Sequence, residues 1–306
     1  MTPKEVSGLL ASSGYMADES LATLVWMAMS LERPMLLEGE AGVGKTAVAR
    51  ALSLALSRPL FRLQCHESLD LNQAVYEWNY SKQLLEIRLR ETEKTVAGNL
   101  REDLFSESFL LQRPLMQAIT SDKPCVLLID EIDRADESFE AYLLEVLGEF
   151  QISVPELGTV KATTQPLVVL TSNGTRDLSD ALRRRCLYHY VDYPSLPREI
   201  EIVKCLVPQA NYVLVQQAVT FVQKLRKQDL EKVPGIAETL DWIRVLCAMG
   251  LDEVPDDPEL IRAALAALLK TRTDQWQIGS EIILRLQSES RVGVDVGVAG
   301  DLRQRA

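Results

Sequence analysis

Short apolar runs separated by amphipathic stretches characterise the chain up to about residue 195, and amphipathic stretches alone follow them. A short apolar run bounded by turn residues predicts a strand buried on both faces, and apolar residues repeated every three to four positions predict a helix. Five strands are expected, at Met35–Leu37, Leu60–Cys65, Cys125–Ile129, Leu167–Ser172 and Leu187–Val191. Because helical stretches lie between them, the pattern predicts an α/β fold class in which a parallel sheet is flanked by helices.

The helical part of the pattern divides the chain into two domains. An α/β domain is expected over residues 1–195, with helices at Glu19–Leu31 and Glu137–Gly148. After a proline-marked linker, further helices are expected at Pro197–Leu206, Asn211–Lys227, Glu238–Met249, Pro258–Lys270 and Thr273–Leu286. They predict an all-helical second domain over residues 196–288. Residues 289–306 lack helical periodicity and are expected to form a flexible tail.

Two stretches of the α/β domain look like insertions. Phe150–Thr164 alternates apolar and polar residues around Pro155 and Gly158, which predicts a β-hairpin before the fourth strand. The segment near residues 78–90 is less regular, and its pattern fits either a hairpin or an amphipathic helix.

A glycine-rich motif follows the first strand directly. Residues 39–46 read GEAGVGKT, a complete match to G-x-x-x-x-G-K-[ST], between a predicted strand and a predicted helix. Backbone N–H groups and the positive helix end favour phosphates there, the lysine amine reaches the β- and γ-phosphates, and the threonine hydroxyl ligates Mg²⁺. The predicted binding residues are Gly39, Glu40, Ala41, Gly42, Val43, Gly44, Lys45, Thr46 and Ala47. The motif predicts that the site binds a nucleoside triphosphate, either ATP or GTP, together with Mg²⁺.

Two acidic residues end the third predicted strand. In an open α/β sheet, ligands bind at the carboxyl ends of the strands, which places Asp130 and Glu131 there. Asp130 is expected to order the magnesium ion together with Thr46, and Glu131 to polarise an attacking water. The alternative is that both acids only cap a helix that begins near Asp136.

Polar residues at the ends of the last two strands extend the candidate site. Asn173 follows the fourth strand, where its amide is expected to position the water, or to serve only as a turn residue. Arg183, Arg184 and Arg185 precede the fifth strand. They are expected to stabilise transition-state charge on a phosphoryl group, in cis or from a neighbouring subunit, with a solvated helix end as the alternative.

Composition limits the partners and the compartment. The net charge of −11 and the pI near 4.9 argue against nucleic-acid binding, which normally needs a basic excess. The five cysteines are widely spaced without a C-x-x-C pair, so buried thiols are expected rather than metal ligands. No apolar run reaches transmembrane length and no signal-peptide pattern is present, so a cytoplasmic protein without a membrane span is expected.

Read in series, the phosphate loop Gly39–Thr46, the acidic strand Val126–Glu131, Asn173 and Arg183–Arg185 resemble the motifs of AAA+ ATPases. With the helical domain after them, the resemblance spans nearly all of residues 15–290. Within that superfamily the chain resembles the MoxR group, for its inserted hairpin and for the segment LSDALRRRC. The phrases AVYEWNY, EAYLLEVLGEFQISVPELG and VPGIAETLDW look closest to the CoxD-like branch, with CbbQ and NorQ as similar neighbours.

The resemblance implies an ATPase that works as a homo-oligomer, a hexameric ring with the helical domain as its lid. It implies an arginine finger at Arg185, with Arg183 or Arg184 as alternates, which is useful in trans only if subunits repeat head to tail and the ring closes. It further implies an adaptor protein with a von Willebrand factor A domain and a client metalloenzyme. CoxD-like members assist maturation of molybdenum-containing carbon monoxide dehydrogenase, whereas CbbQ and NorQ are linked to Rubisco activation and nitric oxide reductase.

One motif departs from the MoxR pattern. Relatives often carry a lid arginine, sensor 2, in a Gly-x-Ser-x-Arg-like turn, but Gly235–Thr239 places Thr239 at that position, with Arg244 as a substitute about one helical turn further on. Two other classes share the phosphate loop, namely DNA-acting AAA+ motors and small-molecule kinases. The acidic balance argues against the first, and the arginine cluster and long helical domain argue against the second.

Overall fold

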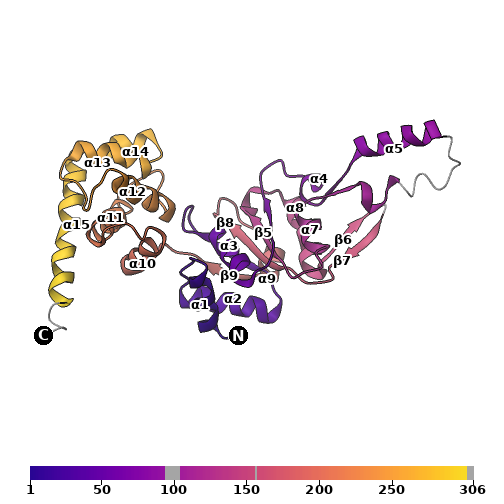
Figure 1. The fold of residues 1–306 in the computed structure, drawn as a ribbon, viewed down its shortest axis with the longest axis horizontal. Helices are drawn as coiled ribbons and strands as arrows, with labels where there is room; N and C mark the ends of the chain where they lie inside the picture. The colour runs from indigo at the N-terminus through magenta and orange to yellow at the C-terminus, as the bar shows by residue number, and fades with distance from the viewer. Residues whose placement is uncertain (94–103, 156, 302–306) are drawn as a thin grey trace. The chain divides into compact units, whose positions relative to one another are not determined.

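The computed structural model describes residues 1–93, 104–155 and 157–301. The chain divides into two compact units, one of residues 1–39 and 45–190 and the other of residues 40–44 and 191–306 (Figure 1). Each unit buries its own cluster of apolar side chains. The two units are therefore two domains, each with a separate core.

A five-stranded sheet forms the centre of the first unit. Its strands are β1 (Met35–Glu38), β2 (Leu60–Gln64), β5 (Val126–Asp130), β8 (Leu167–Ser172) and β9 (Leu187–Tyr190). They lie in the order β2-β5-β8-β1-β9, and every neighbouring pair is parallel. β5 and β8 are buried at every position, whereas the edge strands β2 and β9 are only partly buried. The predicted parallel sheet is confirmed, and the carboxyl ends of its strands meet at one edge.

Helices cover this sheet. They are α1 (Pro3–Ser12), α2 (Glu19–Leu31), α3 (Lys45–Leu56), α4 (Leu71–Ala74), α7 (Pro114–Ile119), α8 (Glu137–Glu149) and α9 (Asp180–Arg185), with short 3-10 turns η1 (Glu107–Phe109) and η2 (Ile132–Arg134). Leu127 and Ile129 of β5 join one core cluster with Leu115 of α7 and Leu143 of α8. The residues that alternate with them point to the other face, and α3 contacts β2, β5 and β8. Helices thus lie on both faces of the sheet, as predicted.

The segment near residues 78–90 forms a helix, which is one of the two predicted alternatives. A short strand β3 (Tyr76–Trp78) pairs antiparallel with β4 (Leu110–Gln112), and helix α5 (Tyr80–Glu93) follows β3 directly (Figure 1). The prediction of an insertion formed by a hairpin within residues 78–90 is wrong, because the partner strand lies beyond the helix. Part of the insertion, residues 94–103, lies outside the described residues.

Trp78 anchors this insertion to the core. Its side chain is only 7% exposed and packs edge-on against Phe105, with ring centroids 5.1 Å apart.

The second insertion agrees with the sequence prediction, since β6 (Gln151–Val154) and β7 (Gly158–Lys161) form an antiparallel hairpin. Both insertions thus extend from the α/β unit as short two-stranded ribbons.

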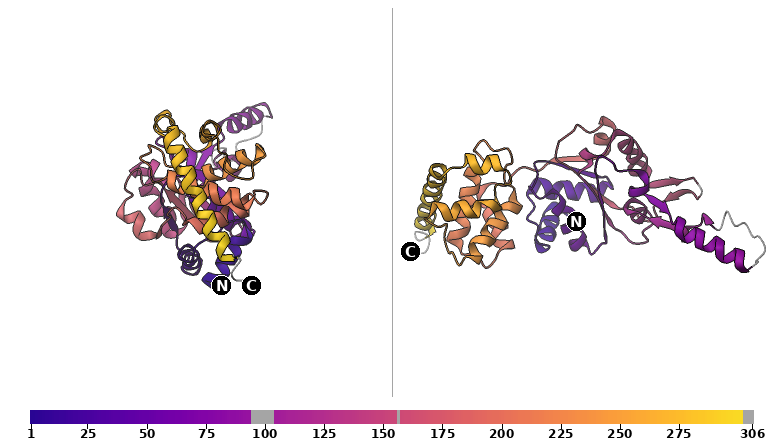
Figure 2. Two further views of the ribbon diagram at one scale, coloured as in Figure 1. Left: turned by 90° about the vertical axis from the view of Figure 1, so that its left-hand side faces the viewer. Right: turned by 90° about the horizontal axis from the view of Figure 1, so that it is seen from above.

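The second unit is helical, as predicted. Its helices are α10 (Leu196–Leu206), α11 (Tyr212–Leu225), α12 (Ile236–Ala248), α13 (Pro258–Ala264), the 3-10 turn η3 (Leu265–Ala267), α14 (Arg272–Gln277) and α15 (Ser280–Asp301). Phe221 of α11 and Trp242 of α12 lie in its core, with ring centroids 5.1 Å apart. α15 packs against α11 (Figure 2).

Helix α15 corrects the expectation for the chain's end. One helix is predicted over Thr273–Leu286 with irregular structure after it, but the structure has α14 over Arg272–Gln277 and a separate α15 that runs from Ser280 to Asp301. A helix that is already nucleated gains one hydrogen bond for each residue added, so it continues through residues with weak helical propensity. The last expected tail residues, 302–306, lie outside the described residues. No helix in the part of the chain that the structure describes is long and apolar enough to cross a membrane.

A buried ion pair joins three parts of the second unit. The guanidinium of Arg226 donates from Nη1 to Oε2 and from Nη2 to Oε1 of Glu199, each at 2.6 Å. Neither side chain is exposed by more than 6%. Arg226 Nε also donates to the carbonyl of Pro234 at 2.8 Å, and Gln223 donates to Glu199 Oε2 at 2.7 Å. The pair therefore fixes α10, α11 and the loop before α12 to one another.

This network gives a structural role to Thr239, the residue predicted at the position of the lid arginine. Thr239 is fully buried, and its hydroxyl donates to Glu199 Oε1 at 3.0 Å. The alternate, Arg244, forms a surface ion pair with Asp241 at 3.1 Å. Thr239 thus completes the buried network of the helical unit.

Candidate active site

The phosphate loop connects β1 to α3. Gly42 and Gly44 have φ angles of +79° and +96°, values that glycine adopts without the steric cost of a Cβ atom. Helix α3 begins at Lys45, directly after the second of these glycines. The first N–H groups of a helix have no partner within it, so the end of the loop presents backbone donors suited to an anion.

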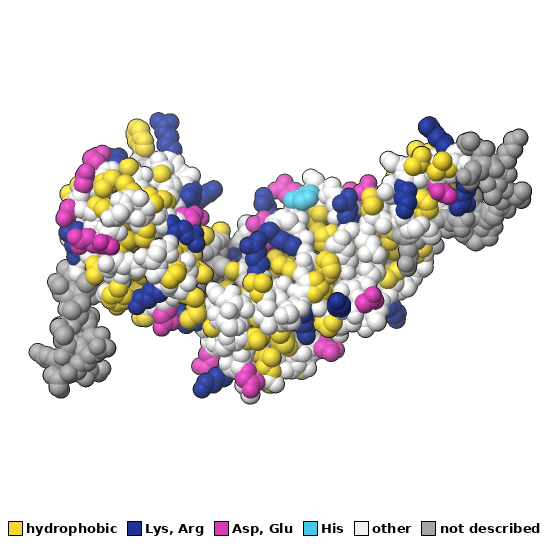
Figure 3. Space-filling model, viewed as in Figure 1, with side chains coloured by type: hydrophobic (Ala, Val, Ile, Leu, Met, Phe, Trp, Pro, Cys, Tyr) yellow, Lys and Arg dark blue, Asp and Glu magenta, His cyan; other side chains and the backbone are white. Residues whose placement is uncertain are grey.

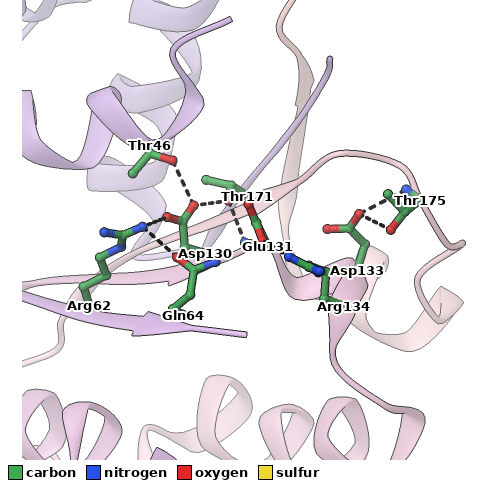
Figure 4. Close-up of polar contacts among 9 residues, drawn as sticks. All are labelled: Thr46, Arg62, Gln64, Asp130, Glu131, Asp133, Arg134, Thr171 and Thr175. Carbon is green, nitrogen blue, oxygen red and sulfur yellow. Dashed lines mark hydrogen bonds and ion pairs between the residues drawn. The ribbon is translucent and has the colours of Figure 1, made fainter. Parts of the chain in front are cut away.

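The two residues that begin α3 lie at the edge of the sheet. Lys45 is only 6% exposed, and its Nζ donates to the carbonyl of Gly39 at 2.7 Å. The hydroxyl of Thr46 donates to Oδ1 of Asp130 at 2.9 Å (Figure 4). The motif at the start of α3 and the acid at the end of β5 therefore meet.

Asp130 is the buried anion of the site. Its side chain is 3% exposed, and its Oδ1 accepts a second hydroxyl, from Thr171 of β8, at 2.5 Å. Its Oδ2 faces the guanidinium of Arg62, whose Nη2 lies 2.6 Å away (Figure 4). A buried carboxylate needs such partners, since removing it from water without them is costly.

Sequence reasoning missed both Arg62 and Thr171. Arg62 lies two residues before Gln64 at the end of β2, and its Nη2 also donates to Gln64 Oε1 at 2.6 Å. Two polar side chains at alternate positions of an edge strand point to one face, which is the available sequence signal. Thr171 carries the weaker signal of a hydroxyl near the end of an apolar strand.

Glu131 begins the turn that leaves β5. Its φ and ψ of +55° and +50° are in the left-handed region, which few non-glycine residues adopt. Its N–H donates to the Thr171 hydroxyl at 2.9 Å, and its Oε2 lies 3.1 Å from Nη1 of Arg134. Such local strain persists where surrounding contacts fix it and is frequent at functional sites. The side chain, one third exposed, lies beside Asp130 at the open edge of the sheet.

A second acid ties the turn after β5 to the loop after β8. Asp133 is buried, and its Oδ2 accepts hydrogen bonds from the N–H of Thr175 at 3.0 Å and from its hydroxyl at 2.6 Å (Figure 4). Although burial acts to raise the pKa of Asp133, hydrogen bonds from Thr175 and from the backbone hold that pKa below its ordinary value. Asn173 lies in the loop fixed in this way, directly after β8. The sequence prediction did not identify this support.

The three consecutive arginines differ in their surroundings. Arg183 lies 3.5 Å from Oε2 of Glu38 at the end of β1, so it is engaged within its own chain. Arg184 and Arg185 are exposed and line a surface pocket of about 630 Å³. Arg184 forms an ion pair with Asp180 at 3.5 Å. The guanidinium of Arg33 donates to the carbonyls of Arg184 and Arg185, at 2.6 and 3.4 Å, which fixes the end of α9.

Comparison with known proteins identifies the family. Residues 34–186 match the model of the AAA domain (dynein-related subfamily), and these residues include β1, the phosphate loop, β5, β8 and α9. The chain belongs to this family. It is an AAA+ ATPase of the dynein-related type. Figure 1 shows its central sheet with helices around it and its helical second unit.

Several proteins resemble this AAA+ ATPase at low identity. An uncharacterized protein of Staphylococcus haemolyticus is 27% identical over 275 residues, which are 88% of this chain and 96% of that protein. The gas vesicle ATPase GvpN1 of Halobacterium salinarum is 24% identical over 209 residues, which are 65% of this chain and 58% of that one. Among solved structures, a single-residue mutant of RuvB from Thermotoga maritima covers 92% of this chain and 73% of its own, with a TM-score of 0.49 and 16% identity.

The residues at the sheet edge fit the ATP and Mg²⁺ that the AAA+ family implies. Gly42 and Gly44 turn the backbone before α3 through positive φ angles, Lys45 brings an ammonium to the loop, and Thr46 and Asp130 bring a hydroxyl and a carboxylate oxygen to within 2.9 Å of each other. Hard oxygen donors of this kind suit Mg²⁺, which proteins usually bind through one or two side chains and the substrate phosphates. Among the described residues no group of three or more His, Cys, Asp and Glu side chains could hold a metal ion by itself.

Proposed function

We propose that this AAA+ ATPase is a MoxR-type protein that couples ATP hydrolysis to the remodelling, assembly or cofactor maturation of a client enzyme. The CoxD-like case, maturation of a carbon monoxide dehydrogenase, is the form of this proposal that the sequence resemblance favours. The observation that carries the ATPase part is the contact of 2.9 Å between the Thr46 hydroxyl and Asp130, with Glu131 next to it in the chain. A Rubisco-activase-like or nitric-oxide-reductase-activating role is the alternative with the same chemistry.

The proposed roles follow from the donors and acceptors at the sheet edge. Thr46 and Asp130 would hold Mg²⁺, and the bound ion would supply positive charge that offsets the negative charge of the triphosphate. Lys45 binds the phosphates, and Glu131 accepts the proton of the attacking water at a carboxylate oxygen. The Thr171 hydroxyl holds the Glu131 N–H at 2.9 Å and itself donates to Asp130, so the two acids are positioned by one side chain. Asn173 is proposed to orient the water from the end of β8.

Arg185 is proposed to act as the finger on the neighbouring subunit of a hexameric ring. Arg185→Ala is expected to lower ATP hydrolysis by about 10³-fold or more while ATP affinity changes little, since the guanidinium meets charge that develops in the transition state. Phosphate release and equilibrium binding of a fluorescent ATP analogue measure the two quantities. Arg184→Ala is the matched comparison, because Arg184 is also exposed in the same turn but is paired with Asp180.

Mixed rings test whether the arginine acts in trans. Equal parts of Arg185→Ala and Glu131→Gln subunits are expected to recover part of the hydrolysis, because some interfaces then pair an intact Glu131 with an intact neighbouring Arg185. Native mass spectrometry establishes that the rings are mixed. Hydrolysis that stays at the level of the separate variants in such rings would contradict a role in trans.

The adaptor with a von Willebrand factor A domain is proposed to dock on the apolar face of α5. Leu84, Leu85 and Leu89 on this helix are each more than half exposed. Lys82 and Arg88 flank them in a chain that is otherwise acidic, and Figure 3 shows basic side chains around the hydrophobic patch at the upper right. The face therefore suits a protein surface with an apolar centre and an acidic rim. Trp78, on the strand before this helix, is excluded as a contact residue because it is buried.

The double variant Leu84→Ser/Leu89→Ser is expected to lower stimulation by the adaptor about tenfold or more, with basal hydrolysis within twofold of the original. Both leucines lie on the helix surface, so the substitutions leave the core unchanged. Leu54→Ser on α3, which removes another exposed leucine, is the control. Full stimulation of the double variant would contradict docking on α5.

A further inference from the structure

The charge of Asp130 is already balanced within the chain. Arg62 Nη2 lies 2.6 Å from Asp130 Oδ2, while the two hydroxyl donors occupy Oδ1. β2 and β5 are paired in register, with Arg62 beside Leu128 and Gln64 beside Asp130, so a long side chain on β2 can reach the acid. Asp130, the acid that is proposed to face magnesium, therefore already has a cation beside it, the guanidinium of Arg62.

The two partners of this ion pair differ in exposure. The side chain of Asp130 is 3% exposed, whereas that of Arg62 is 46% exposed. The acid is fixed by Thr46, Thr171 and its place in the central sheet, but the arginine extends from an edge strand with its flexible stem partly in water. When a second cation approaches Asp130, the arginine is therefore the partner that can move.

We propose that Arg62 is a tethered counter-cation that occupies Asp130 and competes with the incoming Mg²⁺. Gln64 stabilises this occupied state, since its Oε1 accepts a hydrogen bond from the same Nη2 of Arg62 at 2.6 Å. Loading of magnesium then requires the Arg62–Asp130 contact to break. Arg62 is a positioning residue that sets the magnesium concentration at which the site fills. The inference rests on the proposed role of Asp130.

Charge repulsion opposes simultaneous binding of Arg62 and Mg²⁺ at Asp130. A carboxylate shared by a guanidinium and a divalent cation places two positive charges close together, and their repulsion opposes joint binding. A hydrogen bond between charged groups is worth about a tenfold change in an equilibrium constant, or more. Removal of the guanidinium therefore favours Mg²⁺ at Asp130, and it also leaves a buried acid with only neutral donors until the metal arrives.

The test is the Mg²⁺ dependence of binding of a fluorescent, non-hydrolysable ATP analogue. Arg62→Gln is expected to lower the Mg²⁺ concentration at half-saturation about tenfold. Arg62→Lys keeps the positive charge but loses the planar fork of the guanidinium. Its Mg²⁺ concentration at half-saturation is expected to lie between those of the original protein and of Arg62→Gln. Gln64→Leu, which keeps Arg62 and removes its second partner, is expected to lower the midpoint by a smaller factor and protects the test if Arg62→Gln folds poorly.

The matched control is Arg113→Gln. Arg113 and Glu77 form an equally short ion pair, 2.6 Å, at the surface of the same unit, with both side chains 43% exposed. This variant is expected to keep the original Mg²⁺ midpoint. Thermal unfolding of Arg62→Gln supplies a second readout, since Mg²⁺ with the analogue should stabilise it by a larger temperature shift than it stabilises the original protein.

Two results would overturn the inference, and they differ from failure of the proposed function. An unchanged or raised Mg²⁺ midpoint in Arg62→Gln contradicts competition. Weaker binding of the analogue in EDTA, with the same midpoint, shows that Arg62 contacts the nucleotide instead. If Asp130→Asn itself keeps the original Mg²⁺ midpoint, the proposed magnesium site is wrong and the inference falls with it.

Discussion

Replacing Glu131 by glutamine is expected to leave ATP bound while lowering its hydrolysis by about 10²–10⁴-fold, because an amide of the same shape cannot accept the proton of the attacking water. Residue 131 has a left-handed backbone conformation, which glutamine tolerates as glutamate does, so this substitution changes only the side chain. A substitution by glycine would also change the conformational freedom of the backbone. The hydrogen bond from the Glu131 N–H to Thr171 is unaffected by the side-chain change. Single-turnover phosphate release and ATP affinity measure the two parts of the prediction.

A nearby acid provides the control for Glu131→Gln. Glu137 begins α8, is exposed, and lies outside the contacts of Asp130. Glu137→Gln is expected to hydrolyse ATP at close to the original rate. Hydrolysis by Glu131→Gln within a few-fold of the original would show that another group activates the water, and a loss of ATP binding would show that Glu131 supports the site structurally.

Truncation of the buried ion pair should have the largest effect on stability. Arg226→Ala leaves the Glu199 carboxylate, whose side chain is 0% exposed, without its guanidinium, and such a loss costs about 3–5 kcal/mol. The bond from Arg226 to the Pro234 carbonyl is lost with it. Chemical denaturation followed by circular dichroism measures the free energy of unfolding of the helical unit.

Two further variants test whether the loss of the buried ion pair causes the loss of stability in Arg226→Ala. Arg244→Ala removes an arginine from an exposed pair with Asp241 and is expected to cost no more than about 1 kcal/mol. The double variant Glu199→Leu/Arg226→Met is expected to recover much of the stability lost in Arg226→Ala, because no buried charge then lacks a partner. If Arg226→Ala and Arg244→Ala cost the same, the buried pair is not the element that holds the helical unit together.

Local patterns in the sequence were sufficient for several parts of this protein. The phosphate loop is encoded within eight consecutive residues, Gly39–Thr46, because glycine positions and the lysine–threonine pair act through local backbone geometry. β5 and β8 were predicted from their apolar runs, since a strand buried on both faces has no polar alternation. The helical character of the second unit and the hairpin β6–β7 followed from periodicity in the same way.

Contacts between distant parts of the chain were decided only by the tertiary structure. β3 pairs with β4 across α5, so no local pattern could identify the partner strand. Arg62 and Asp130 are 68 residues apart and meet only because β2 lies beside β5 in the sheet. Their pairing depends on strand order, which apolar runs do not specify because each run fits any position within a buried sheet.

Contacts between distant elements also decide the surroundings of Thr239 in the helical unit and of the three arginines Arg183–Arg185. The sequence identified Thr239 as a departure from a lid motif, but only the packing of α10, α11 and α12 places it against Glu199 and Arg226. In the sequence, the run Arg183–Arg185 consists of three equivalent cations. The fold makes their surroundings different, because it places Glu38 beside Arg183. The sequence by itself determined where the central strands and most of the helices form and where a phosphate can bind, because those features depend on near neighbours in the chain. The tertiary structure decided which charges meet, because that depends on how distant elements pack.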